Sequence, residues 1–345
     1  MNTNLSGTKS LLAALSLLFA LALAAPPARA QDTTNEVPLG EEEEEVADPG
    51  GFTAMSPKTT SGTTATGGPE AIVFDGTYIW IPRQFKNAVL RVRAADGGKG
   101  GSFSVGRGPV ALLYAAGSIW SANLLDNTVT KLRASDGARQ GTFAVGAGPG
   151  ALAFDGANVW VSNRNADTVT KLRASDGAVL GTFKTGRRPM GLACREGVVW
   201  VANNLDDTVT RLRASDGLRL GTHAVGDGPF GVASAGTVVV VSNFFGHSLT
   251  KLNGADGAPL GTYKVGHDPA GLFYDGANLW VALSGDNAVA KVRPSDGAVL
   301  ATFKVGQTPL AVLFDGVNAW SVNFGSDSVS TTNAAAGGSG DAEVQ

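Results

Sequence analysis

The decapeptide TVTKLRASDG occupies Thr128 to Gly137, and the same ten letters return at Thr168 to Gly177. A near copy, TVTRLRASDG, follows at Thr208 to Gly217, so the segment recurs every 40 residues. Self-similarity at a fixed period of this length is typical of solenoids, propellers and other repeat arrays. The period is therefore the first property of the chain that its fold must explain.

Two residue columns show how strict the period is. Proline recurs every 40 residues, at Pro69, Pro109, Pro149, Pro189, Pro229, Pro269 and Pro309. Tryptophan recurs at the same interval, with Val240 in the one remaining position, at Trp80, Trp120, Trp160, Trp200, Trp280 and Trp320. No insertion or deletion interrupts the array, so each repeat is expected to be one structural unit.

Each repeat reads as four short β-strands. In the third repeat they are GALAF, NVWVSN, TVTKLRA and LGTFKTG, in which alternating, β-branched and aromatic residues predominate. Asp-Gly pairs between them tolerate positive φ and indicate tight hairpins. Four antiparallel strands in about 40 residues is the size of one propeller blade. The decapeptide is thus a third strand followed by the turn into the fourth.

The two ends of the array indicate a closed ring. The last repeat supplies only three strands, LAVLFDG, NAWSVN and SVSTT. The missing fourth strand has a counterpart in GTTATGGP, at Gly62 to Pro69, which matches GTFAVGAGP less one residue. We expect residues from about Gly51 to Thr66 to complete the last blade, which leaves no exposed sheet edge at the seam.

The chain is therefore predicted to be an all-β, seven-bladed β-propeller with four antiparallel strands per blade, closed by an N-terminal strand that completes the last blade. The alternative is a linear solenoid, which usually needs atypical capping repeats, whereas the end repeats here look ordinary.

Two columns fit a propeller core. Seven innermost strands crowd the axis, and the residue two after each proline is small: Ala71, Ala111, Ala151, Gly191, Gly231, Gly271 and Ala311. Each Trp is expected to pack between neighbouring blades and to bury roughly 150–250 Å². At about 25 cal/mol per Å² this burial supplies several kcal/mol per interface. Val240 is expected to leave blade five less tightly packed.

The ends of the chain outside the array suggest targeting and linker segments. Lys9 precedes the apolar run LLAALSLLFALALAA, and PPARA ends in an A-x-A site, so residues 1–30 are predicted to be a signal peptide cut after Ala30. The alternative is an uncleaved anchor helix. Residues 31–50, with the acidic run Glu41 to Glu45, read as a disordered linker, or else as a calcium-binding or partner-binding tail. Residues 51–333 form the propeller and 334–345 a flexible tail.

Composition excludes some classes of protein. The 345-residue chain carries a net charge of −3, which does not fit a nucleic-acid binder. The single cysteine, Cys194, rules out an intramolecular disulfide framework and is expected to be a buried structural thiol. We expect a monomer that is secreted or periplasmic, with no membrane span after removal of the signal.

The residues after each Trp resemble a known repeat. WVSN at Trp160, WVAN at Trp200 and VVSN at Val240 are similar to the tetrapeptide that names the YVTN family of 40-residue β-propeller repeats. Over about Gly51 to Asn333 the chain also resembles the virginiamycin B lyase (streptogramin lyase) family of seven-bladed propellers. That resemblance implies elimination chemistry on a cyclic ester antibiotic, with magnesium and a His/Glu cluster over the channel mouth.

One column departs from the lyase pattern. Lyase repeats typically read W-F-T-E where this chain reads W-V-S-N, and the Glu column is replaced by Arg83, Asn123, Asn163, Asn203, Asn243, Leu283 and Asn323. The only Glu within the array are Glu70 and Glu196, and Glu196 is expected on the opposite face. Elimination needs a base to remove a proton and a metal to stabilise the developing charge, so a binding scaffold without a catalytic set is the preferred interpretation.

A ligand site is expected where the repeats differ. The loops after strand four and after strand two share one face, around what we call the funnel mouth, and the Asp-Gly hairpins lie on the other face. Basic residues come from the first four blades: Arg83, Lys86, Arg107, Arg164, Arg187 and Arg188. Aromatic and acidic residues come from the last three: Phe230, Phe244, Phe245, Phe324, Asp227 and Asp268. The pattern favours an amphipathic or anionic ligand, and the alternative is neutral drift on a solvated rim.

Three histidines are close in sequence. His223 replaces the Phe or Tyr of other fourth strands, so packing is its expected role. His247 stands in a column otherwise filled by Asn87, Asn127, Asp167, Asp207, Asn287 and Asp327. We expect that column to cap the turn into strand three, and His247 to have lost this role. His267 lies in the mouth loop of the next blade.

Two hypotheses about function follow. The first is an exported propeller that binds a partner protein or a small-molecule ligand at the funnel mouth, with no cofactor. The second is a lyase-like, metal-assisted enzyme of the virginiamycin B lyase type, with magnesium or calcium and with His247, His267, Asp268, Asp227 and Glu70 as candidate catalytic residues. No spacing in the sequence identifies a metal site.

Overall fold

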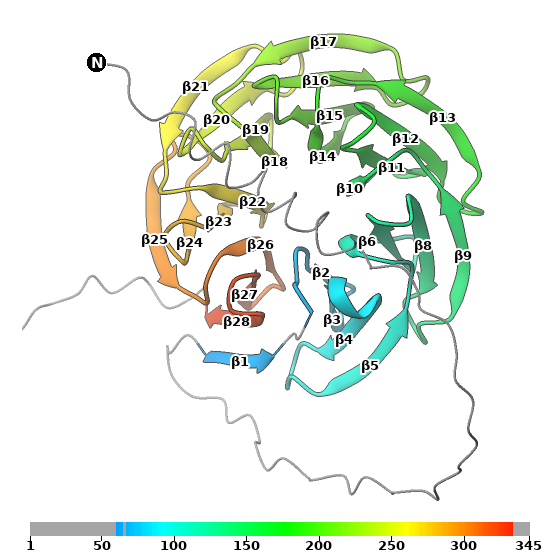
Figure 1. Cartoon of the computed structure of the whole chain (residues 1–345). Helices are drawn as coiled ribbons and strands as arrows, with labels where there is room; N and C mark the ends of the chain where they lie inside the picture. Colours follow the sequence, from blue (N-terminus) through cyan, green and yellow to red (C-terminus); the bar gives the residue numbers. More distant parts are fainter. Residues whose placement is uncertain (1–59, 65–66, 334–345) are drawn as a thin grey trace, which may run out of the picture. The chain divides into compact units, whose positions relative to one another are not determined.

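Seven four-stranded antiparallel sheets form the fold in this computed structural model, which describes residues 60–64 and 67–333 (Figure 1). The sheets stand around a common axis, with the first strand of each blade innermost and the fourth at the periphery (Figure 1). The predicted seven-bladed β-propeller is therefore confirmed.

Each blade contributes one strand to each of four concentric positions. The innermost strands are β2 (Val73–Phe74), β6 (Pro109–Ala115), β10 (Pro149–Phe154), β14 (Pro189–Arg195), β18 (Pro229–Ala235), β22 (Pro269–Tyr274) and β26 (Pro309–Phe314). The second strands are β3 (Tyr78–Arg83), β7 (Ser118–Asn123), β11 (Asn158–Asn163), β15 (Val198–Asn203), β19 (Val238–Asn243), β23 (Leu279–Leu283) and β27 (Asn318–Asn323).

The outer half of each blade repeats just as regularly. The third strands are β4 (Ala88–Arg93), β8 (Thr128–Arg133), β12 (Thr168–Arg173), β16 (Thr208–Arg213), β20 (Ser248–Asn253), β24 (Ala288–Val292) and β28 (Ser328–Asn333). The fourth strands are β5 (Lys99–Ser104), β9 (Arg139–Ala144), β13 (Val179–Lys184), β17 (Arg219–Ala224), β21 (Pro259–Lys264), β25 (Val299–Lys304) and β1 (Thr60–Thr64). One 3₁₀ turn, η1 (Gln84–Lys86), lies in the first blade.

The seam between the chain ends closes as the repeat count predicts. β1 pairs antiparallel with β28, and Thr60 lies opposite Thr331. The last sheet therefore has the order β1-β28-β27-β26 and combines both ends of the array (Figure 1). An exposed edge on β28 is avoided in this way.

Small residues near the axis allow the innermost strands to approach closely. A Cβ on Gly191 would lie 2.4 Å from the carbonyl oxygen of Phe230 in the next blade, and one on Gly231 would lie 2.7 Å from that of Ala270. Because such contacts are shorter than van der Waals distances, glycine is required at these positions. The prediction of a crowded axis is confirmed.

The Trp column forms the interfaces between blades. Trp80 packs against Ile119 and Leu132 of blade two, and Trp160 packs against Val199 and Leu212 of blade four. Five of the six indoles have no exposed surface, and Trp320 at the seam is 8% exposed. Every blade except blade five, which has Val240, is therefore joined to the next by one large aromatic side chain, as predicted.

A cation on the third strand reinforces five of these interfaces, those of Trp80, Trp120, Trp160, Trp200 and Trp280. The ammonium of Lys131 lies 5.1 Å from the Trp120 ring centroid and donates hydrogen bonds to the carbonyls of Ala174 and Ser175 in the next blade. Lys171 repeats this arrangement over Trp160. The aliphatic stem covers the indole while the charged end reaches polar backbone groups.

Several predictions concern residues outside the described ranges. The signal peptide at 1–30, the linker at 31–50 and the tail at 334–345 all lie there. Within residues 60–64 and 67–333, no helix is long and apolar enough to cross a membrane.

Candidate functional site

The loops after strand two and after strand four meet on one face of each blade. The backbone N–H of Leu124 donates to the carbonyl of Gly108, and the N–H of Arg164 donates to that of Gly148. On the other face, Ala134 bonds to the hairpin residue Gly117. The predicted assignment of loops to two faces is therefore confirmed, and the funnel mouth is built by the paired loops.

A column of polar side chains joins the mouth loops of adjacent blades. Asn87 Oδ1 accepts from the N–H of Gly108 at 3.0 Å, and Asp167 Oδ1 accepts from that of Arg188 at 2.8 Å. We call Asn87, Asn127, Asp167, Asp207, His247, Asn287 and Asp327 the inter-blade capping column. All seven have positive φ, between 46° and 55°. They cap the next blade's loop rather than only their own turn, because the left-handed backbone directs each side chain across the interface.

His247 keeps the role of its column, contrary to the prediction. Its Nδ1 accepts a hydrogen bond from the backbone N–H of Asp268 at 3.1 Å, in the way that Asn87 accepts from Gly108. The unprotonated imidazole nitrogen replaces the amide oxygen as the acceptor. The sequence could not reveal this because imidazole is an unusual substitute for Asn or Asp.

The Asn column that replaces the lyase-type Glu is structural here. Asn163 has no exposed surface, and its Nδ2 donates to the hydroxyls of Thr168 and Thr170. Asn203 makes the same pair of bonds and also accepts from the N–H of Gly186. These amides therefore join the end of strand two to the start of strand three within each blade.

Ion pairs between the two mouth loops of a blade hold three of the variable mouth residues. Arg107 Nε lies 2.6 Å from Asp126 Oδ1, and Arg187 Nε lies 2.5 Å from Asp206 Oδ1. His267 Nδ1 lies 2.7 Å from Asp286 Oδ1 in the corresponding place of blade six. The side chains of both arginines are about two-thirds exposed, so these pairs contribute little to stability. Arg107 and Arg187 lie on the solvated rim.

A charged cluster spans the funnel mouth itself. Glu70 precedes β2 of blade one, and Arg164 follows β11 of blade three, yet the two side chains interact electrostatically. Because these blades are not neighbours, the interaction extends across the mouth over blade two. Gln84 donates a hydrogen bond to Glu70, and Arg188 lies near Arg164. We call Glu70, Gln84, Arg164 and Arg188 the mouth cluster.

Burial dominates the protonation of the mouth cluster. Desolvation raises the pKa of Glu70, and the Arg164 guanidinium and the Gln84 hydrogen bond oppose that rise. Desolvation lowers the pKa of Arg164, and Glu70 opposes it. The pKa of Arg188 is lowered by burial and then by the charge of Arg164. The enclosed cluster contains two cationic side chains and one carboxyl group.

Two atoms of the mouth cluster have unmet hydrogen-bonding capacity. Arg164 Nε and Gln84 Oε1 are buried and have no hydrogen-bond partner among the described residues. Most buried polar atoms in proteins have a partner, so such groups need an explanation. Arg164 lies directly over Gly150, and because glycine has no side chain there is room for the guanidinium at this position. A bound ligand is one explanation for the unpaired atoms.

The residue before each repeated proline of the array has a left-handed backbone conformation, and in two blades this residue is Arg188 or Asp268. In blades one, two, three and five it is glycine, with φ between 64° and 68°. Arg188, Asp268 and Thr308 hold the same left-handed conformation with φ between 50° and 53°. That conformation disfavours residues with a Cβ. The side chains of Arg188 and Asp268 are therefore kept at a backbone cost of order 1 kcal/mol.

Aromatic side chains gather on blade five. The Phe230 and Phe244 ring centroids are 5.9 Å apart, and Phe244 meets Phe245 edge to face at 5.3 Å. Phe244 is 8% exposed, so it forms the base of this group. The backbone N–H of Gly246 donates to the carbonyl of Asp227, which places Asp227 beside the group. Arg83 and Phe324 are half-buried elsewhere in the mouth loops, and Lys86 is exposed.

The two mouth histidines form a separate cluster between blades five and six. The His247 and His267 rings meet edge to face at 5.3 Å, and His247 Nδ1 lies 3.2 Å from Asp268 Oδ1. Burial raises the pKa of Asp268, and both imidazoles oppose that rise. Among the described residues, no group of three or more His, Cys, Asp or Glu side chains is arranged to hold a metal ion. The structure thus brings together three of the five candidate catalytic residues.

Sequence reasoning missed Asp286 in this cluster. The signal was present, because Asp126, Asp206 and Asp286 recur in alternate blades, opposite Arg107, Arg187 and His267. His223 was predicted correctly: its ring packs 6.5 Å from that of Trp200.

Comparisons with known proteins agree with the fold. No family model matches the chain, and no curated protein matches it. Among solved structures, a streptogramin B lyase is 16% identical, with a TM-score of 0.70 over 81% of this chain and 97% of that chain. Virginiamycin B lyase from Staphylococcus aureus gives the same identity and score over 81% and 99%. Hydrazine synthase from Kuenenia stuttgartiensis is also 16% identical, with a TM-score of 0.69 over 80% and 98%.

These similarities cover almost the full length of each neighbour, but at this level of identity they concern the fold alone. The seven-bladed fold of this chain agrees with the lyase structures among them. The chain is a seven-bladed β-propeller whose architecture is that of the virginiamycin B lyases.

Proposed function

We propose that this protein is an exported binding scaffold that holds an anionic ligand with an apolar portion at the funnel mouth. The mouth cluster carries the proposal. Its two arginine side chains are half-buried, Arg164 Nε is buried and lacks a hydrogen-bond partner among the described residues, and Arg188 adopts a conformation that usually requires glycine. A carboxylate, sulfonate or phosphate group would supply the missing acceptor.

The apolar portion of the ligand is assigned to blade five. Phe230 and Phe244 lie at the start of β18 and the end of β19, at the same end of the strands as the loops that carry Arg164 and Arg188. Aromatic side chains bind apolar groups and lose little conformational entropy in doing so. The ligand is either a small molecule or an acidic, aromatic segment of a partner protein.

A fluorescent sulfonate, anilinonaphthalene sulfonate, tests the site directly. We expect Arg164→Gln to weaken its binding at least about tenfold, as expected for loss of one charge-assisted hydrogen bond. Arg107→Gln is the matched control, because Arg107 also lies on the mouth face but is paired with Asp126 on the solvated rim. Equal affinities of the two variants would refute the proposed site.

Export is the second part of this proposal. It rests on the apolar run before Ala30 and on the A-x-A site. Expression of the full chain, followed by N-terminal sequencing of the accumulated protein, is expected to give Gln31 as the first residue. A protein that retains residues 1–30 would be evidence for the anchored alternative.

The enzyme hypothesis rests on the His247, His267 and Asp268 cluster. Glu70 takes part in a different group of contacts, with Gln84 and Arg164, so the five candidate residues divide into at least two sets. A metal-assisted activity predicts that magnesium or calcium raises the melting temperature and that EDTA reverses the effect. If neither ion changes the melting temperature at millimolar concentration, the metal-assisted hypothesis fails.

A further inference from the structure

The interface between blades five and six lacks the aromatic side chain that fills the equivalent interfaces. Trp80, Trp120, Trp160, Trp200 and Trp280 each fill such a position and have no exposed surface. Val240 occupies the corresponding position on β19 and is 3% exposed. Because valine is much smaller than tryptophan, this interface contains space that the others do not.

The walls around the missing indole are conserved within the chain. In blade three, the ammonium of Lys171 lies over one part of the Trp160 ring and the Phe183 ring packs against it at 5.5 Å. The equivalent residues in blade five are Lys251 and Tyr263, and the Lys251 ammonium lies 5.3 Å from the Tyr263 ring centroid. The cation and the aromatic wall are thus retained where the indole is absent.

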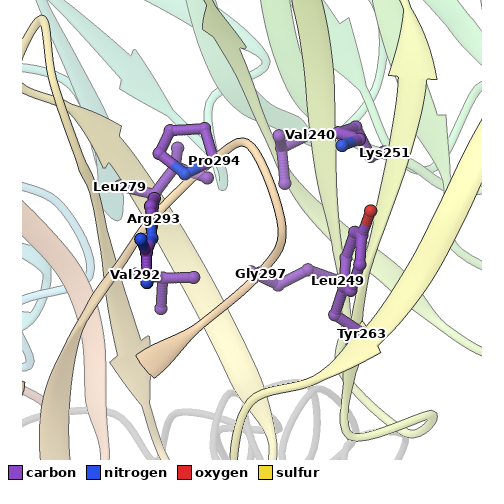
Figure 2. Close-up of a pocket in the computed structure, with 9 residues that line it drawn as sticks. All are labelled: Val240, Leu249, Lys251, Tyr263, Leu279, Val292, Arg293, Pro294 and Gly297. Atoms are coloured by element: carbon purple, nitrogen blue, oxygen red, sulfur yellow. The ribbon is translucent and has the colours of Figure 1, made fainter. Parts of the chain in front are cut away.

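A cavity lies at this position (Figure 2). Val240, Leu249, Lys251 and Tyr263 line it on the blade-five side, and Leu279, Val292 and the hairpin residues Arg293, Pro294 and Gly297 line it on the blade-six side. Its enclosed part is about 10 Å³, about the room that one water needs, within about 200 Å³ of empty space that includes open solvent. Figure 2 shows Arg293, Pro294 and Gly297, from the hairpin between β24 and β25, among the residues that line the cavity.

Tyr263 is positioned differently from the phenylalanines in the other blades. Phe103 stands with the edge of its ring against Gly137, whereas Tyr263 has its Cβ and Cγ against Gly297. Rotation of the Tyr263 ring to the phenylalanine position would widen the cavity, and a molecule of the size of a Trp side chain needs that rotation to fit.

We propose that this cavity binds a small planar aromatic molecule of the size of indole, with its face beneath the Lys251 ammonium. The five occupied interfaces show which shape and chemistry these walls accept. Ala235 stands where Asp155 accepts the indole N–H of Trp160, so the cavity provides no carboxylate for a ring N–H. Aromatic molecules with and without a ring N–H are therefore expected to bind alike.

Fluoroindole observed by fluorine NMR, with the intact chain, tests the proposal. We expect saturable broadening of the fluorine signal and, with excess indole, a rise in melting temperature of about 2–4 °C. Val240→Trp fills the cavity with the chain's own indole and is expected to abolish binding. Val299→Trp is the matched control, because it adds a Trp at a 44% exposed position of β25 and should leave binding unchanged.

Two further comparisons keep the test decisive. If Val240→Trp does not fold, Val240→Phe reduces the same space with a smaller ring and should weaken binding at least about tenfold. Indene should bind as tightly as indole, and its saturated analogue at least several-fold more weakly, because only an aromatic face attracts the ammonium. Equal binding by the wild type and the cavity-filled variant, or no saturation with indole, would overturn the proposal.

Discussion

Asp327 and Gly67, 260 positions apart in the sequence, are joined by a hydrogen bond from the Gly67 N–H to the Asp327 carboxylate at 2.8 Å. The same carboxylate accepts from the N–H of Gly68 at 3.2 Å. At the other interfaces the capping side chain bonds to a loop that the chain also connects covalently to its own blade. At the seam, the side chain of Asp327 links the two ends of the array.

Loss of the seam cap is expected to cost more than loss of an internal cap. Asp327→Ala removes an acceptor shared by two backbone N–H groups, and we expect a loss of about 2 kcal/mol in the free energy of unfolding. Asp207→Ala removes one equivalent bond, to Gly228, and should cost about 1 kcal/mol. Urea unfolding measures both values. Equal losses would show that the seam is no more dependent on its cap than the other interfaces.

A missing carboxylate in blade two offers a stabilising substitution. The indole N–H of Trp160 donates to Asp155 at 2.8 Å, but Trp120 Nε1 is buried without a partner and Ala115 stands at the aspartate position. Ala115→Asp with Ala116→Gly restores the Asp-Gly turn and is expected to raise the free energy of unfolding by about 1 kcal/mol.

Blade five supplies the control for that substitution. Ala235→Asp creates the same Asp-Gly turn before Gly236, but Val240 gives the carboxylate no indole to bind. Thermal unfolding of the two variants should therefore differ in sign. If both variants are more stable than the wild type, the gain in stability comes from the Asp-Gly turn alone.

His247 tests the chemistry of the inter-blade capping column. His247→Asn keeps a side-chain acceptor for the Asp268 N–H and suits positive φ, so stability should change by less than about 0.5 kcal/mol. His247→Ala removes the acceptor at a residue with φ of 48° and should cost about 1–2 kcal/mol. Chemical denaturation distinguishes the two, and equal stabilities would mean that the bond to Nδ1 contributes nothing.

Cys194 is expected to be chemically inert in the folded protein. Burial, and to a lesser extent the charge of Asp155, raise the pKa of its thiol to about 12. Only the thiolate reacts, so a disulfide reagent at about pH 8 should modify folded Cys194 about 1000-fold more slowly than an ordinary thiol. Because the folded state retains this proton more tightly, its contribution to stability is lost as pH rises from the ordinary thiol pKa towards 12. Rapid modification without unfolding would contradict the assignment.

Binding of a sulfonate at the mouth cluster should depend on pH through Glu70. Its pKa is raised by burial, so Glu70 becomes neutral at a higher pH than an ordinary glutamate as the solution is acidified. A neutral Glu70 no longer repels an anion, and affinity should improve by about 1 kcal/mol as pH falls through that raised pKa. Fluorescence titrations of Glu70→Gln should show the tighter affinity at all pH values. If Glu70→Gln keeps the wild-type pH profile, Glu70 is not the group that makes the affinity depend on pH.

The sequence predicted the fold because each repeat shows the same pattern of strands independently of the others. The Pro and Trp columns predicted the number of blades. The last repeat ends with the strand that begins at Ser328, and the fourth strand that it lacks matched the extra strand before Pro69. These inferences require only strand patterns and their count. Side-chain partners across loops cannot be predicted in this way, because the sequence does not show that Asp286 faces His267 or that Asn87 reaches Gly108.

The mouth cluster illustrates the same limit. Arg164 and Glu70 were each selected as departures from the repeat, but their interaction joins blades one and three across the axis. No periodic pattern connects residues of blades one and three, which approach each other only because the blades curve around a common axis. The cavity beside Val240 was more accessible to prediction, since one missing Trp already indicated looser packing there.

The pairing of β1 with β28 also has a consequence for how the protein is made. β1, the first strand of the described residues, has its partner at the far end of the array, so this sheet cannot be completed until translation has passed Asn333. Contacts between residues so far apart in the sequence form slowly. Until they form, β28 has an unpaired edge. The same edge accepts β1 from a second copy, so refolding at high concentration should yield domain-swapped dimers.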